Sequence, residues 1–103
     1  DKGPVPKPLT LVSLAGCTGM DVIAILTKMR TVPKFFNVKV SGELSQKEPQ
    51  YYERINIIYE ISSDVPREKV EKAVKLSQEQ YCGVSAMLRQ AAEITYQIKT
   101  REN

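Results

Sequence analysis

The residues best suited to covalent chemistry in this chain are its two cysteines, Cys17 and Cys82. Each stands beside a glycine and is followed by a hydroxyl residue and an apolar run, in the segments Gly16–Met20 and Tyr81–Ser85. The dipole of a helix favours thiolate at its first turn, and Cys82 is expected to have this setting. The pair could form a disulfide or supply a reactive thiol. The alternative is two unrelated buried thiols, because free cysteine is among the most buried residue types.

Cys17 has polar neighbours on its expected helix. At about 3.6 residues per turn, Ser13, Cys17 and Asp21 fall along one line of a segment that is otherwise mostly apolar. A thiol that only fills space in a core has no need of such neighbours, so the line favours a reactive role for Cys17. A carboxylate at Asp21 would oppose ionisation of this thiol unless it binds a cation. Lys7, Arg89 or a residue outside this chain could supply that cation.

Composition and charge exclude several classes of function. Fifteen basic and 12 acidic residues leave a net charge of +3 that is spread along the chain, so no nucleic-acid partner is expected. No histidine accompanies the two cysteines, which argues against a structural zinc site, and neither a metal nor another cofactor is expected. The longest apolar candidate is interrupted by polar residues such as Thr18 and Asp21 before it reaches roughly 20 residues. With no secretory signal, we expect a cytoplasmic protein that does not bind membranes.

The apolar segment around Cys17 also predicts how the chain assembles. From Leu9 to Leu26 the expected helix is apolar around most of its circumference, so other elements must cover it on several sides. A chain of 103 residues forms one domain and has little else to cover such a helix with. We therefore expect a sheet on one side of the helix and a second subunit on another.

The elements that must position the cysteines follow an α+β order without internal repeats. Residues 1–8 hold three prolines and are expected as an extended lead-in, with Pro8 as the first helical residue. Beyond it, periods near 3.6 predict helices and periods of two predict strands. The expected elements are a helix over 8–30, an antiparallel hairpin of strands 36–44 and 51–61, a helix with its start signal at 62–64 that runs to 77, a short helix that begins near 82, and a last strand over 94–99.

Two segments of the chain resemble a known family. Pro8–Val22 and Lys75–Leu88 are similar to the two cysteine motifs of the OsmC family, which comprises osmotically inducible protein C and the organic hydroperoxide resistance proteins. The resemblance covers essentially all of residues 1–103, which we expect to form a single OsmC-like domain without the N-terminal strand region of the family. It implies an α+β fold in which two long helices, each carrying a cysteine, pack against an antiparallel sheet in an intertwined homodimer.

The resemblance also implies a thiol-dependent peroxidase of the oxidative stress response. By analogy, Cys17 would be peroxidatic and would attack a hydroperoxide as thiolate to give a sulfenic acid. Cys82 would then resolve this sulfenic acid as a disulfide. A dithiol reductant, of lipoyl type in relatives, would restore both thiols.

The chain departs from the hydroperoxide-resistance branch at Lys7. That branch has at this position a glutamate that holds an activating arginine, and the arginine belongs to the N-terminal strand region. Lys7 could supply the positive charge itself, with Ser13 and Asp21 as supporting residues. The alternative function is a non-catalytic dimeric protein that keeps the fold and the cysteines, and that binds a small apolar ligand or senses redox state.

Overall fold

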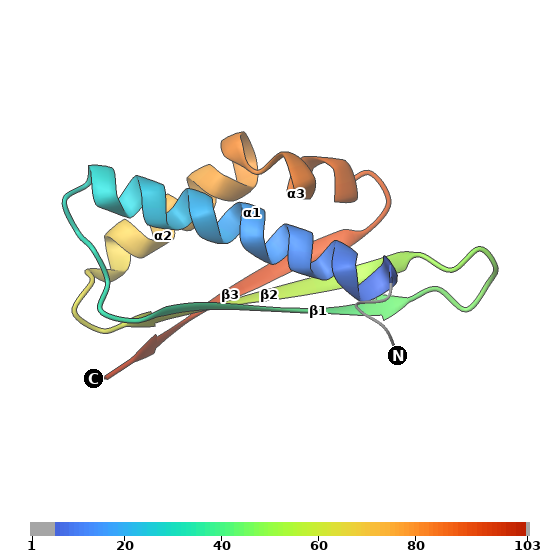
Figure 1. Ribbon diagram of the computed structural model, residues 1–103, viewed down its shortest axis with the longest axis horizontal. Helices are drawn as coiled ribbons and strands as arrows, with labels where there is room; N and C mark the ends of the chain where they lie inside the picture. The colour runs from blue at the N-terminus through green and yellow to red at the C-terminus, as the bar shows by residue number, and fades with distance from the viewer. Residues whose placement is uncertain (1–5, 103) are drawn as a thin grey trace.

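The fold has two layers, a small sheet and a set of helices that covers one of its faces (Figure 1). The computed structural model describes the backbone of residues 6–102 and the side chains of residues 8–102. It confirms the predicted α+β order, and most element bounds agree with the prediction within a few residues. The elements are α1 (Pro6–Lys28), β1 (Phe36–Leu44), β2 (Tyr52–Ser62), α2 (Arg67–Leu76), the π-helical turn η1 (Ser77–Tyr81), α3 (Gly83–Leu88) and β3 (Glu93–Arg101).

Helix α1 begins two residues earlier than predicted. Its first residue is Pro6, so the expected extended lead-in is wrong for residues 6 and 7, while residues 1–5 lie outside the described part of the chain. Proline is compatible with a first helical turn, where backbone N–H groups have no partner within the helix. The helix closes with Arg30 at a φ of 60°, and the N–H of Thr31 donates to the carbonyl of Leu26 over 2.9 Å. This is a Schellman-type ending, and it turns the chain toward β1.

The sheet is mixed, which corrects the predicted antiparallel arrangement. β1 and β2 form the expected antiparallel hairpin, with Val38 opposite Tyr59. β3 pairs with the other edge of β2 in parallel, with Tyr96 opposite Ile57, so the strand order is β1-β2-β3. The segment α2–η1–α3 crosses the face of the sheet and returns the chain to the end at which β2 began, as parallel pairing requires. Periodicity predicts a strand but not its direction.

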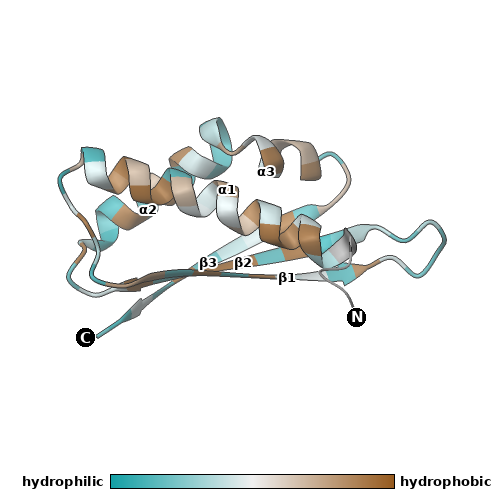
Figure 2. Cartoon of the chain, in the orientation of Figure 1, coloured by the Kyte–Doolittle hydropathy of each residue, from teal (hydrophilic) through white to brown (hydrophobic). Residues whose placement is uncertain are grey.

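The core lies between the helices and the central strand. Figure 2 shows apolar residues along most of α1 and along the strands beneath it. The side of α1 that faces the sheet buries Leu14, Val22 and Leu26 completely. They belong to one apolar cluster that also includes Ile55, Ile57 and Ile61 of β2 and Val70, Ala73 and Val74 of α2. Cys82 belongs to the same cluster, so the packing of the core positions the second cysteine.

The length and composition of α1 would also allow it to cross a membrane. The span Pro8–Lys28 has a mean hydropathy of 1.9 in its most apolar window, of which 22% is buried in the described structure. The prediction that no segment reaches membrane-spanning length is therefore wrong by this measure. Thr18 and Asp21 of this helix make hydrogen bonds to other elements. These bonds attach α1 to β2 and to η1 in the described structure.

Candidate functional site

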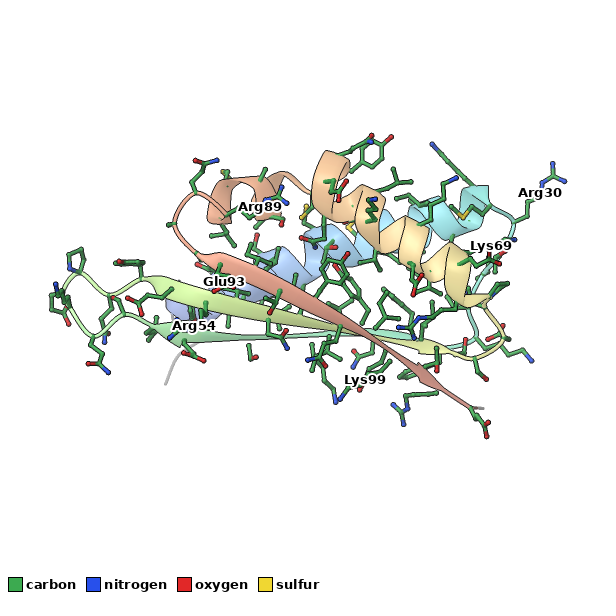
Figure 3. All side chains as sticks on the ribbon, turned by 180° about the vertical axis from the view of Figure 1, so that it is seen from behind. Arg30, Arg54, Lys69, Arg89, Glu93 and Lys99 are labelled. Atoms are coloured by element: carbon green, nitrogen blue, oxygen red, sulfur yellow. The ribbon has the colours of Figure 1, made fainter. Side chains whose placement is uncertain are left out.

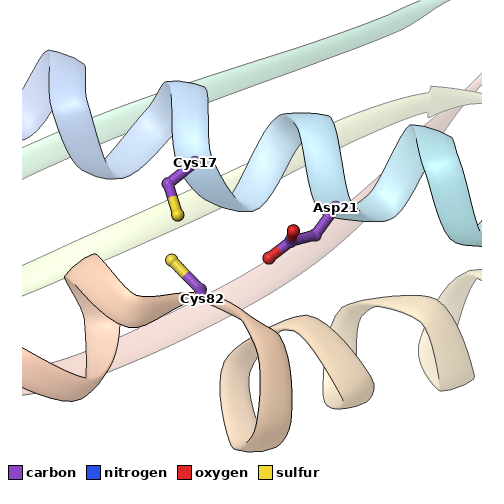
Figure 4. Close-up of side chains that lie close together, drawn as sticks. All are labelled: Cys17, Asp21 and Cys82. Atoms are coloured by element: carbon purple, nitrogen blue, oxygen red, sulfur yellow. The ribbon is translucent and has the colours of Figure 1, made fainter.

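Two sulfurs and a carboxylate converge between α1 and the helical segment that follows α2. The Sγ atoms of Cys17 and Cys82 and a carboxylate oxygen of Asp21 all lie within 4.8 Å of one another. Figure 4 shows the two sulfurs facing each other across the gap between the helices, with the Asp21 carboxylate beside them. Both cysteines are free thiols. Because a disulfide bond is about 2.05 Å long, the sulfurs must move closer to form one.

The other predicted site residues do not join this cluster in the described structure. Ser13 is exposed on α1, although it lies about one helical turn before Cys17. Arg89 follows α3 (Figure 3) and is exposed. It makes no ion pair with Asp21. The Lys7 side chain lies outside the described residues. Among the side chains of residues 8–102, the structure thus supplies no cation that pairs with Asp21.

Cys82 stands at the N-cap of α3, but its thiol is not activated there. The backbone N–H of Ser85 donates to Cys82 Sγ over 3.4 Å, as expected for a residue that starts a helix. The Cys82 side chain is nevertheless buried, with 3% of its surface exposed. The pKa of the Cys82 thiol is raised to about 11, chiefly by burial and to a lesser extent by the neighbouring Cys17, although the Ser85 N–H acts to lower it. The expectation that helix position would favour thiolate at Cys82 is therefore wrong, because desolvation outweighs the effect of a short helix.

The second cysteine also lies in a different kind of element from the long helix that the family resemblance implied. The helical path from α2 widens into the π-helical turn η1, where the N–H of Cys82 donates to the Ser77 carbonyl over 2.7 Å. At Cys82 the backbone becomes extended, with φ −82° and ψ 99°, before the short helix α3 begins. π-Helical turns often occur at functional sites. This break in the helix directs the Cys82 sulfur toward α1 (Figure 4).

A buried network of polar side chains underlies the cysteines, and sequence reasoning missed it. Gln78 donates its side-chain amide to Thr18 Oγ1 over 3.2 Å and to the Tyr59 hydroxyl over 2.8 Å, and it accepts from Ser85 Oγ over 2.7 Å. Thr18 Oγ1 lies 2.6 Å from the Tyr59 hydroxyl and 2.7 Å from Ser77 Oγ. A sequence signal existed, because Thr18 interrupts the otherwise apolar line of α1 that faces the core. The network joins α1, β2, η1 and α3.

The direction of the hydroxyl bonds follows from the carboxylate at the end of the network. Ser77 Oγ donates to Asp21 Oδ2 over 3.0 Å, so its proton is committed to an acceptor that has none to offer. Thr18 must then donate to Ser77, and the Tyr59 hydroxyl must donate to Thr18. Bonds that run in one direction polarise one another. The chain from Tyr59 to Asp21 therefore orients the carboxylate beside the two sulfurs.

Taken together, the fold and the site define an α+β protein in which a long helix and a π-helical turn present two thiols to each other beside an anchored carboxylate. The chain belongs to the OsmC-like protein family, whose model matches residues 1–97. It is 35% identical over 97 residues to Protein YhfA of Escherichia coli strain K12, a match that covers 93% of this chain and 72% of that protein. Membership of this family supports a redox role for the paired cysteines.

Solved structures give the same result for the fold. A hypothetical protein from Aquifex aeolicus VF5 is 38% identical and superposes with a TM-score of 0.87, over 98% of this chain and 78% of that one. An organic hydroperoxide resistance protein OsmC from Legionella pneumophila superposes with a TM-score of 0.77, over 96% of this chain and 72% of that one. The second protein is only 12% identical, so the likeness shows a shared fold.

Proposed function

We propose that the protein reduces organic hydroperoxides with Cys17 as the peroxidatic thiol and Cys82 as the resolving thiol. The observation that carries this proposal is the pair of free sulfurs that face each other within 4.8 Å on separate elements. Family membership supports it, because relatives of the same fold are named for organic hydroperoxide resistance. The unequal burial of the two thiols supports this choice of peroxidatic and resolving cysteine.

Cys17 would react first because its side chain is half-buried, whereas Cys82 is almost fully enclosed. The Cys17 thiolate attacks the terminal peroxide oxygen, an S–O bond forms, the O–O bond breaks, and the alcohol leaves with a proton. Cys82 sulfur then attacks the resulting sulfenic acid, an S–S bond forms, and the hydroxyl leaves as water with the Cys82 proton. A dithiol, proposed to be of lipoyl type, returns both cysteines to thiols and is itself oxidised to a disulfide.

The first step needs Cys17 as thiolate, so a positive neighbour has to be supplied to the site. We propose Lys7 for this role, with Arg89 as the other candidate in this chain. Because a cation near a thiol favours the reactive thiolate, Lys7→Met is expected to slow the reaction of Cys17 with peroxide. An unchanged reaction rate in this variant would exclude Lys7 as the activating cation.

The test of the proposed activity is peroxide turnover with reduced protein. Consumption of cumene hydroperoxide in the presence of dihydrolipoamide is expected for the wild-type chain and is expected to be lost in Cys17→Ser. Cys82→Ser is expected to leave Cys17 open to further oxidation, so intact mass should show sulfinic and sulfonic acids at Cys17 after peroxide treatment. Turnover that persists in Cys17→Ser would contradict the proposal.

A second function is favoured by two observations at the same site. The pKa of the Cys82 thiol is raised, and no described cation pairs with Asp21. Both features suit a non-catalytic protein that senses redox state by forming the disulfide once, or that binds an apolar ligand. A single stoichiometric oxidation without turnover, even with excess dithiol, would identify the redox sensor.

We further propose that the protein is a cytoplasmic homodimer. The exposed side of α1 carries Leu9, Val12 and Met20, and an apolar groove between α1 and β1 is lined by Ile23, Phe36 and neighbouring small residues. A second copy of the chain would cover this surface and complete the burial of α1.

A further inference from the structure

We propose that Cys17, Asp21 and Cys82 form a reversible binding site for a thiophilic divalent cation such as Zn²⁺. This proposal does not rest on the proposed peroxidase activity, because it concerns the reduced protein without peroxide. It also differs from the structural zinc site that the sequence argued against. Here three protein ligands would hold the ion, and water would occupy the fourth coordination position. Catalytic zinc sites have this arrangement, whereas structural zinc sites have four protein ligands.

The ligand atoms are of the right kind and lie near one another. Thiolate sulfur and carboxylate oxygen are both ordinary zinc ligands, and two thiolates favour soft or borderline metals over Mg²⁺ or Ca²⁺. The sulfurs of Cys17 and Cys82 and a carboxylate oxygen of Asp21 all lie within 4.8 Å of one another. In a tetrahedral site with Zn–S bonds near 2.3 Å, two sulfurs stand roughly 3.8 Å apart. The two sulfurs would thus have to approach by about 1 Å or less, and each sulfur and the carboxylate oxygen by slightly more.

The side chains converge from two elements on one space. Cys17 and Asp21 are one turn apart on α1, so both project from the same side of the helix. Cys82 points back at them from the break between η1 and α3 (Figure 4). Cys17 and Asp21 are half-buried, which leaves a route for an ion and for a water on the open position.

Hydrogen bonds outside the three ligands would hold two of them in place. Ser77 donates to Asp21 Oδ2 over 3.0 Å and leaves Oδ1 available for an ion. The Ser85 N–H donates to Cys82 Sγ over 3.4 Å and would stabilise negative charge on this sulfur. Such outer partners orient metal ligands and commonly change metal affinity by about 10- to 100-fold. The buried network through Thr18 and Gln78 anchors both donors.

The same geometry makes the bound ion and the disulfide mutually exclusive. Both thiols would bind the metal as thiolates, each giving its proton to solvent, and each sulfur can serve either the metal or the S–S bond. A bound cation would therefore protect the two sulfurs from oxidation. Conversely, oxidation to the disulfide would release the ion.

Metal titration of the reduced protein tests this inference. With Zn²⁺ and a competing chromophoric chelator, one equivalent per chain is expected to bind, and Co²⁺ is expected to give a sulfur-to-cobalt charge-transfer band. Asp21→Asn keeps an oxygen acceptor for Ser77 but removes the carboxylate, and should weaken Zn²⁺ binding by about tenfold or more. Cys82→Ser should reduce the charge-transfer band. Asp64→Asn, at an exposed carboxylate, is the matched control and should bind as the wild type does.

The outcomes separate this inference from the proposed peroxidase. Protein oxidised by diamide to the disulfide is expected to lose Zn²⁺ binding and to recover it on reduction. The inference is wrong if reduced protein fails to bind one equivalent, or if Asp21→Asn and Cys82→Ser both leave the affinity and the cobalt spectrum unchanged. Peroxide turnover without metal binding would contradict the metal site and leave the proposed activity supported. Metal binding without peroxide turnover would support the metal site and contradict the proposed activity.

Discussion

At the scale of single residues, Cys82 shows how two physical effects compete at one atom. The Ser85 N–H at the start of α3 favours the thiolate, and burial in the apolar core favours the thiol. Burial has the larger effect, and the pKa rises from an ordinary value of 9.0 to about 11. Cys82 is therefore a protonated thiol at neutral pH, which fits a residue that reacts second.

This pKa predicts a pH dependence for both ionisation and stability. Titration of the ¹³Cβ shift of Cys82 in cysteine-labelled protein should show thiol up to about pH 10, with a midpoint near 11. Because the unfolded thiol ionises near 9.0, the folded state binds more protons between these values. The contribution of Cys82 to the free energy of unfolding should then fall as pH rises from about 9 to 11. A midpoint at or below 9 would show that the helix start controls this thiol.

At the scale of elements, the π-helical turn η1 fixes the site by connecting four elements through buried polar side chains. Ser77 and Gln78 are consecutive and both buried, which places two hydrogen-bonding side chains against α1 at once. Within the described residues, no buried side-chain polar atom lacks a partner. A network of this kind is stabilising only while all of its members are present, because an unpaired buried polar group is costly.

Removing the Thr18 hydroxyl, at the centre of the network, should lower the free energy of unfolding. Thr18→Val keeps the shape of the side chain but leaves Tyr59, Ser77 and Gln78 each without one hydrogen-bond partner. The free energy of unfolding, measured by urea denaturation, should fall by about 1–3 kcal/mol. Thr27→Val on the exposed side of the same helix is the control and should change it by less than about 0.5 kcal/mol. Equal effects of the two substitutions would contradict the role given to the network.

At the scale of the whole molecule, the described chain covers the apolar helix α1 only in part. Its inner side packs on the sheet and on α2, whereas Val12 is 62% exposed and Met20 is 76% exposed on its outer side. A run of apolar residues left on the surface marks an interaction site more often than an ordinary surface. The proposed homodimer accounts for this exposure and for the high mean hydropathy of the helix.

A charge on this surface should prevent the proposed dimer from forming. Met20→Glu would bury an unpaired carboxylate in the interface and should shift the mass measured by light scattering from two chains to one. Met87→Glu, at a methionine of α3 that is 68% exposed, is the matched control and should remain dimeric. A wild-type chain that is already monomeric, or a Met20→Glu protein that stays dimeric, would exclude this interface.

The amino-acid sequence by itself determined the features that depend on local patterns. Apolar spacing predicted the long helix that carries Cys17, the hairpin and the last strand, because periods of 3.6 and two are properties of short segments. The two cysteine motifs indicated the family, and the family model confirms it. The pairing of Cys17 with Asp21 on one helical line also follows from local spacing alone.

Only the tertiary structure decided the features that depend on which segments meet. The parallel direction of β3 follows from the path of the helices across the sheet, and the facing of Cys82 toward Cys17 follows from the break after η1. The raised pKa of Cys82 and the network through Thr18 arise from burial by residues that are distant in the chain. Solvent exclusion is a property of the packed molecule, and it is what distinguishes the two thiols.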